Sequence, residues 1–299
     1  MVRAALAAVL VVGLAACGGS AEEPRVDDGA DVVVELASAA QDTADAESAR
    51  MSMQMTYHDT GREGIDGQTI EMDGVLRLDG SVGEFTVDFA ALGEQGGEAV
   101  DVRIIDGVTY MDFRPLVSSF GDDGPAGIAE LRWVKLDPAA LGVPDQRPGF
   151  DAGQSTSNLE YLTMLTGSDD IVALGEDDLD GVSARHYRVR LDGDALSARF
   201  DLDEVAPRLR QPIQQQLEGL VGRTLTIEVW IGVDDNLVRR QVTTLPMLTP
   251  AVLGRGEDAT MEIDVTYSDF GVEVDSEAPP DDEVTDYLDY IDLMEELAP

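Results

Sequence analysis

The chain has 299 residues, 43% of them hydrophobic, with 60 acidic and 20 basic side chains and a formal net charge of −40. The acidic excess extends along the whole chain, which argues against nucleic acid as a partner and against a body lying flat on anionic headgroups. Cys17 is the single cysteine, so no disulfide can form within the chain and a packed core must supply its stability.

The first residues have the layout of an export signal. One arginine precedes an apolar run over residues 4–16, which is shorter than the roughly 20 residues that a membrane span needs. Residues 14–17 (LAAC) resemble the lipobox of bacterial lipoproteins, where the chain is cut before the cysteine and the thiol receives a diacylglycerol. The sequence therefore predicts a signal peptide over 1–16 and a lipid anchor on Cys17 that holds the chain on the extracytoplasmic face of the cell membrane.

Composition divides the rest of the chain into three parts. Small, polar and acidic residues over 17–30, beginning with the lipidated cysteine, predict a flexible tether. One domain is expected over 31–280, opening with a helix over 31–48 where apolar residues recur at helical spacing. Residues 281–299 form an acidic, amphipathic C-terminal segment.

After the first helix the hydrophobic period changes to two. Methionines alternate with polar residues over 51–58, which predicts a strand with one buried and one wet face. Further strand candidates lie at 70–78, 85–89, 100–104, 108–113, 131–136, 170–174, 183–191, 225–231, 237–245 and 261–267. Turn pairs such as Asp79-Gly80 and Asp106-Gly107 separate several of them and favour antiparallel hairpins.

Two internal segments return to a helical pattern. A short helix is expected over 155–165, ending at Gly167, and a second over 201–219, where Pro207 and Pro212 should delay its start or bend it. Ten or more strands with helices at the start, middle and end predict an α+β fold. We expect a strongly curved antiparallel sheet, a half-barrel wrapped over a few helices, because a sheet of this size has to curl or close.

Several short stretches occur in an ordered set along the chain. They are Tyr161-Leu162, Gly167-Ser168-Asp169-Asp170, Gly175-Glu176, Asp180-Gly181-Val182, His186-Tyr187, Glu228-Val229-Trp230-Ile231, Val238-Arg239-Arg240, Ser268-Asp269-Phe270-Gly271 and Ala278-Pro279-Pro280. Together they resemble the actinobacterial LolA-like lipoproteins related to the LppX/LprG group. The resemblance implies a half-barrel that holds acyl chains between sheet and helices, with a lipid or lipoglycan and an envelope transporter as partners. The acidity and the glycine-rich loop at Gly93–Gly97 depart from the family and leave the ligand's identity open.

Methionines on consecutive strands are the most suggestive residues. Methionine is flexible and polarizable and suits a cavity that adapts to different acyl chains, although such a stripe also suits an ordinary filled core. The cavity reading, with the resemblance, predicts a lining of Met53, Met55, Tyr57, Met72, Leu76, Phe85, Phe89, Leu162, Leu165, Leu209, Ile213, Ile227 and Val229.

Metal and cofactor sites are not expected. His58 and His186 are the only histidines, and no motif links them, whereas zinc needs three or four ligands; His186 is expected at a polar surface or edge position. Residues 176–181 imitate the first half of a calcium loop, but Tyr187 occupies the position that requires a bidentate glutamate, so a hairpin turn is predicted instead.

Neither Gly-x-Ser-x-Gly nor His-Glu-x-x-His occurs, and nothing pairs a nucleophile with a base, so an enzyme is not expected. Two functions remain. The first is a lipoprotein that carries or presents a lipid in the cell envelope. The alternative is a surface interaction or sensor module with a filled core and an acidic tail that binds a protein. A continuous cavity between sheet and helices distinguishes the first from the second.

Overall fold

The computed structural model describes residues 29–61, 66–89, 99–115, 131–140, 170–197, 207–246 and 259–297. The strands are β1 (Ser48–His58), β2 (Thr69–Arg77), β3 (Val82–Asp88), β4 (Val100–Ile105), β5 (Val108–Asp112), β6 (Trp133–Leu136), β7 (Asp170–Leu179), β8 (Val182–Asp192), β9 (Thr224–Gly232), β10 (Val238–Pro246), β11 (Thr260–Ser268) and β12 (Val284–Asp286). The helices are α1 (Gly29–Asp45), α4 (Gly193–Ser197), α5 (Pro207–Leu220) and α7 (Tyr287–Leu297), with a 3-10 turn at Asp281–Glu283.

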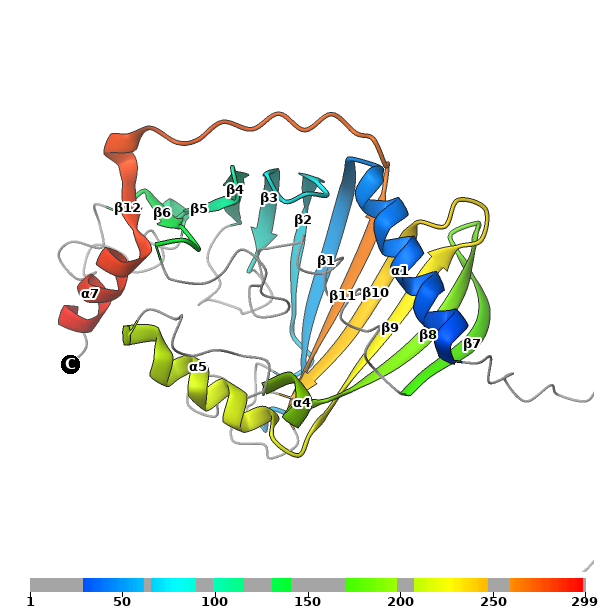
Figure 1. Cartoon of the computed structure of the whole chain (residues 1–299). Helices are drawn as coiled ribbons and strands as arrows, with labels where there is room; N and C mark the ends of the chain where they lie inside the picture. Colours follow the sequence, from blue (N-terminus) through cyan, green and yellow to red (C-terminus); the bar gives the residue numbers. More distant parts are fainter. Residues whose placement is uncertain are drawn as a thin grey trace, which may run out of the picture.

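All of these strands belong to one 12-stranded sheet in the order β12-β6-β5-β4-β3-β2-β1-β11-β10-β9-β8-β7. Figure 1 shows a strongly curved sheet that stays open, with α1 lying across the concave side of its right half. The predicted α+β fold with a curved, mainly antiparallel sheet is therefore confirmed. Its centre is the pairing of β1 with β11, which joins two antiparallel meanders.

Tight turns fix the register of the hairpins. Asp106-Gly107 joins β4 to β5 and Asp180-Gly181 joins β7 to β8, and all four residues have positive φ angles. This is the backbone of the two-residue turn whose twist matches that of the flanking strands. The segment that imitates a calcium loop thus forms the predicted hairpin turn.

The first helix ends earlier than predicted, and the later one is described from Pro207 to Leu220. The first helix stops at Asp45, before the predicted Ser48, because Glu47 takes a left-handed backbone conformation and Ser48 already pairs with Arg77 in the sheet. The later helix begins at Pro207, where a proline fits the first turn because its missing N–H has no partner to lose. The helix predicted over 155–165 lies outside the described residues.

The C-terminal segment is built differently from a single amphipathic helix. A strap, residues 271–280, leaves the centre of the sheet and runs past the ends of the strands to its far edge (Figure 1). Ser48 Oγ donates to the Val272 carbonyl at 2.6 Å, and Arg103 Nη1 donates to the Glu277 carbonyl at 3.1 Å. Beyond the strap, β12 pairs with β6 in parallel, an exception to the predicted antiparallel sheet.

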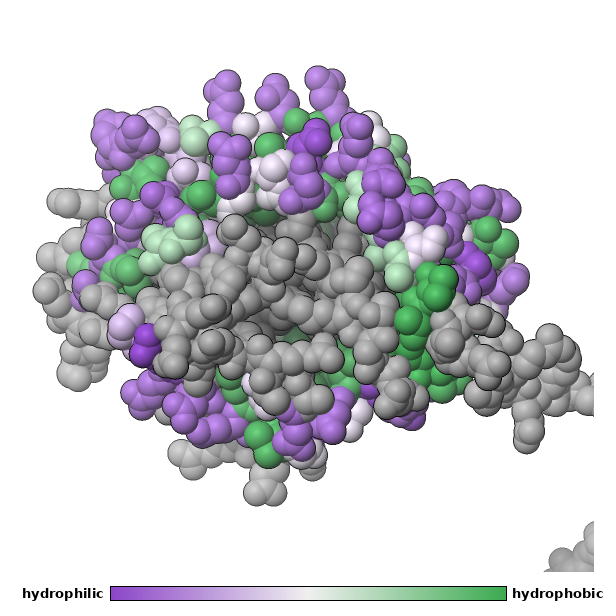
Figure 2. All heavy atoms as spheres, viewed as in Figure 1, coloured by the Kyte–Doolittle hydropathy of each residue, from purple (hydrophilic) through white to green (hydrophobic). Residues whose placement is uncertain are grey.

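Charge is concentrated on the outside of the strap. Its acidic side chains Glu273, Asp275 and Glu277 are exposed and alternate with half-buried residues. Figure 2 shows hydrophilic side chains projecting along the margin where the strap runs in Figure 1. Among the described residues, no helix has the length and apolar character to cross a bilayer.

Candidate functional site

The concave face of the sheet is mainly apolar from β8 to β4. On β1, Met51, Met53, Met55 and Tyr57 are buried, while the alternate residues point to the opposite, convex face. These residues belong to one hydrophobic cluster that also contains Leu36 and other apolar residues of α1. The period of two in the sequence therefore gives β1 one face that lies in the hydrophobic cluster and one face that is more exposed to water.

One cross-strand row runs through the middle of this face. Its members, from β8 to β4, are Tyr187, Val229, Gln241, Val265, Met53, Met72, Val87 and Val100. Every side chain of this central row is buried. All but two of them are purely apolar or carry only a thioether, so a ligand along the row would meet mainly hydrocarbon and methionine sulfur.

Gly74 shapes the face beside the methionines. It pairs with Phe85 across β2 and β3, and a Cβ added to Gly74 would lie 2.5 Å from Phe85 Cδ1 and 2.2 Å from the Glu84 carbonyl oxygen. The phenyl ring therefore occupies the space over the glycine. Phe85 is only 1% exposed as a result, so the glycine is required by close packing and not by an unusual backbone angle.

Tyr57 lies at the far end of the methionine strand, paired with Met261 of β11. The side chain is buried, and this burial raises the pKa of its phenol above the ordinary value. Burial disfavours the charged phenolate form, so the Tyr57 hydroxyl is neutral.

A polar clamp holds α1 over one end of the concave face. Glu35 of α1 forms an ion pair with Arg185 of β8. Arg185 Nη2 also donates to Asn236 Oδ1 at 2.8 Å, and Asn236 Nδ2 donates to Asp42 Oδ2 at 2.6 Å. Thr43 Oγ1 accepts from the backbone N–H of Val238 at 2.8 Å. Helix α1 is thus fastened to β8 and to the turn between β9 and β10.

A second apolar cluster closes the other end of the same strands. It contains Leu217 and Leu220 of α5 with Leu225 of β9, and Leu191 and Leu245 pack against it. The short α4 packs on α5 and on the end of β8. The concave face between this cluster and the polar clamp is the candidate site.

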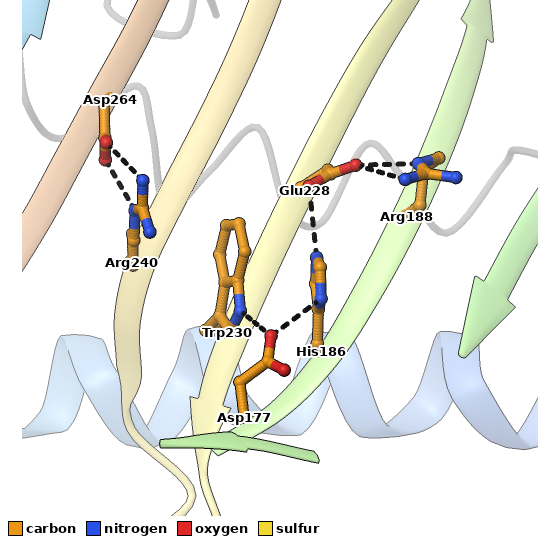
Figure 3. A network of polar contacts seen from close by, with 7 residues as sticks. All are labelled: Asp177, His186, Arg188, Glu228, Trp230, Arg240 and Asp264. Atoms are coloured by element: carbon orange, nitrogen blue, oxygen red, sulfur yellow. Dashed lines mark hydrogen bonds and ion pairs between the residues drawn. The ribbon is translucent and has the colours of Figure 1, made fainter. Parts of the chain in front are cut away.

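The convex face carries a polar network that we call the outer clasp (Figure 3). Its members, from β7 to β11, are Asp177, His186, Arg188, Glu228, Trp230, Arg240 and Asp264. Figure 3 shows these side chains on one side of the strands and α1 behind them, so the clasp lies on the face opposite the candidate site.

Trp230 is the centre of the outer clasp. The His186 ring stacks on it with centroids 4.0 Å apart, and the Arg240 guanidinium lies 4.8 Å from the ring centroid. Trp230 Nε1 donates to Asp177 Oδ2 at 2.7 Å. His186 places one ring nitrogen 3.0 Å from Asp177 and the other 3.2 Å from Glu228. His186 is thus on the outer surface, as predicted, although its side chain is only 14% exposed.

The structure brings a large part of the predicted lining together. Its hydrophobic cluster contains Met53, Met55, Tyr57, Met72, Leu76, Phe85, Ile227 and Val229, with Phe89 packed against it. Leu162, Leu165 and the lipidation residue Cys17 lie outside the described residues, and for Leu209 and Ile213 the description covers only the backbone of α5.

Gln241 and Thr243 belong to this face and were not predicted. The β9–β10 pairing shifts register between Val238 and Arg240, a β-bulge. Val238 and Gln241 are therefore both buried, whereas Val242 is only half-buried. Strict alternation would place Val238 and Val242 on one face, and the bulge reverses the faces within the strand.

No model of a known protein family matches the chain. A Streptomyces griseus protein, described as an uncharacterized 31.2 kDa protein in the rplA-rplJ intergenic region, is 25% identical over 251 residues, which cover 76% of this chain and 74% of that protein.

Solved structures similar to this chain include two mycobacterial proteins. Lipoprotein LppX from Mycobacterium tuberculosis is 15% identical, with a TM-score of 0.45 over 83% of this chain and 100% of LppX. LprF from Mycobacterium bovis is 14% identical, with a TM-score of 0.37 over 82% of this chain and 97% of LprF.

Proposed function

We propose that the chain is an extracytoplasmic lipoprotein that binds the acyl chains of a lipid or lipoglycan on the concave face of its sheet. It carries or presents this lipid in the cell envelope while acyl chains on Cys17 anchor it to the membrane. The observation that carries the proposal is the central row, in which buried and mainly apolar side chains of neighbouring strands lie side by side from β8 to β4, with methionines at the middle.

Burial of hydrocarbon supplies the affinity in this proposal. Each methylene removed from water contributes about 0.8 kcal/mol, so a long acyl chain needs no covalent chemistry to be retained. Met53 and Met72 pair directly at the centre of the lining. Their unbranched side chains adapt to chains of different shape, which suits a binding role and not a catalytic one.

The tether and the charge have complementary roles in the proposal. The anchor on Cys17 keeps the domain near the bilayer. The net charge of −40 keeps the body from settling on anionic headgroups. The domain then reaches the bilayer surface to load or release a lipid, and an envelope transporter is the expected partner for that exchange.

A Cys17→Ser chain, produced without residues 1–16 and therefore without signal peptide or lipid anchor and purified without detergent, tests the proposal. Native mass spectrometry and analysis of organic extracts should find a co-purified lipid at a defined stoichiometry. A lipid-free protein that also fails to bind added fluorescent fatty acid contradicts the proposal. That result would favour the surface interaction module with a filled core.

A further inference from the structure

Gln241 is a buried amide with one end unpaired. Its side chain is 3% exposed, and its Nε2 donates to Thr243 Oγ1 at 3.2 Å. Its Oε1 accepts no hydrogen bond from any described residue. Buried polar atoms in native proteins nearly always have a partner, because an unpaired acceptor away from water is destabilising. The side-chain carbonyl of Gln241 therefore lacks the hydrogen-bond donor that a buried acceptor normally has.

Gln241 lies within the candidate site, so a molecule bound there is placed to donate this hydrogen bond. Gln241 lies in the central row, between Val229 of β9 and Val265 of β11. Along its own strand it lies between Val238, which bonds to α1, and Leu245, which packs on the α5 cluster. The amide thus faces the middle of the concave side, away from both of its closed ends.

The bulge in β10 is what turns Gln241 inward. Arg239, the extra residue, pairs with Asp235 and lies over the Phe270 ring at 4.9 Å. Without the bulge, alternation from Val238 would direct Gln241 to the convex face, where water would satisfy its amide. Bulges commonly re-aim a side chain beside a functional site.

We propose that Gln241 recognises the polar end of the bound lipid, an inference that rests on the proposed function. A hydroxyl or amide N–H at the junction between acyl chain and headgroup donates to Gln241 Oε1. The acyl chain then follows the central row across Met53 and Met72 to Val100 on β4. This path crosses five strand spacings, about 24 Å along the sheet, comparable with an extended long acyl chain. The ligand class is a lipid with a neutral donor group at that junction.

Two probes that differ by one donor test this assignment. They are 1,2-dipalmitoylglycerol and its 3-O-methyl ether, whose affinities are measured on the Cys17→Ser chain by competition with a fluorescent fatty acid. The unsubstituted site should prefer the alcohol by roughly 10-fold, the effect of pairing one buried acceptor. Gln241→Met, which keeps the length of the side chain but removes the amide, should bind both probes equally. Gln54→Met, on the convex face of β1, should keep the preference.

The outcomes separate the two proposals. Equal binding of both probes by the chain with Gln241 overturns the role of Gln241 and leaves lipid binding standing. A preference that survives in Gln241→Met overturns the role as well. If the fluorescent fatty acid binds but neither probe displaces it, the role of Gln241 is overturned and lipid binding stands; a chain that binds neither the fatty acid nor either probe contradicts both proposals. Gln241→Leu serves as a second variant, and thermal unfolding verifies that each substituted chain is folded.

Discussion

Gln241 and Met53 lie on either side of Val265, and each pairs directly with this valine across the sheet. Two strand spacings, about 10 Å, therefore separate an amide with an unpaired carbonyl from the first methionine of the central row. In the proposed complex one lipid contacts both, the amide with its polar junction and the methionine with its chain. This relationship sets the orientation of the proposed lipid, with its polar junction at Gln241 and its acyl chain running toward β4.

The two faces of β1 should respond oppositely to the same substitution. Met53→Trp inserts a large ring into the buried central row, so binding of a fluorescent fatty acid should fall at least about 10-fold, with overpacking that costs about 1–3 kcal/mol. Gln54→Trp, one residue away on the exposed convex face, should leave binding unchanged. Titration with the fatty acid and urea unfolding measure the two effects. If Met53→Trp is destabilised but binds normally, the row is core and not a binding surface.

Gly74 should tolerate no larger side chain. In Gly74→Val, the new atoms meet the Glu84 carbonyl and the Phe85 ring at distances that force the backbone or the ring to move. We expect the free energy of unfolding to fall by more than about 2 kcal/mol, as for other overpacked positions. Urea unfolding measures this loss. Asp73→Val, at the exposed neighbouring position of β2, is the control and should change stability by less than about 0.5 kcal/mol.

The outer clasp should stabilise one edge of the sheet. His186→Ala removes the ring that stacks on Trp230 and bonds to Asp177 and Glu228. The expected loss is about 1–2 kcal/mol, and hydrogen exchange of the β7 and β8 amides should become faster while β2–β4 stay protected. His58→Ala, at the end of β1, is the matched control. Uniform acceleration across the sheet would show that the clasp supports the whole fold and not its edge.

Asp112 should contribute a pH-dependent part of the stability. Burial by itself would raise the pKa of this carboxyl, but hydrogen bonds and charge from Arg114 outweigh it and hold the pKa below its usual range. A lowered pKa in the folded state means that the contribution is present above the unfolded pKa and is lost as the pH falls through the folded one.

The corresponding variant is Asp112→Asn. At pH 7 it should be less stable than the unsubstituted chain by about 1–2 kcal/mol. The difference should begin to shrink as the pH falls below about 4, where the carboxyl of the unfolded chain begins to be protonated, and it should be lost as the pH falls through the lower pKa of the folded state. Urea unfolding at several pH values measures it. A difference that is constant with pH would mean that Asp112 acts through packing alone.

The strands and their faces were predictable where the pattern is local. Alternating methionines in β1 and Asp-Gly turns between strands indicate both the period and the hairpins, and each follows from sterics within a few residues. The same logic failed at Gln241, because a bulge at Arg239 depends on how β9 and β10 pair and leaves no mark in the alternation. A missed bulge changes which residues line the site.

The end of the chain was harder to predict for a related reason. Val284-Thr285-Asp286 is too short to show a period, and its strand conformation comes from pairing with the distant β6 edge. Helical spacing in the neighbouring residues dominated the local pattern, and α7 does form from Tyr287. Contacts between remote segments determine such elements, so no local propensity reveals them.

The pairing of β1 with β11 has a consequence for the order in which the chain folds. Arg50 pairs with Ser268, so the centre of the sheet joins segments from nearly opposite ends of the chain. Until the later segment arrives, β1 has one open edge, the kind of edge that invites pairing with other chains. Contacts this remote in sequence also form slowly. The sheet therefore cannot be completed until the segment around Ser268 is available to pair with β1.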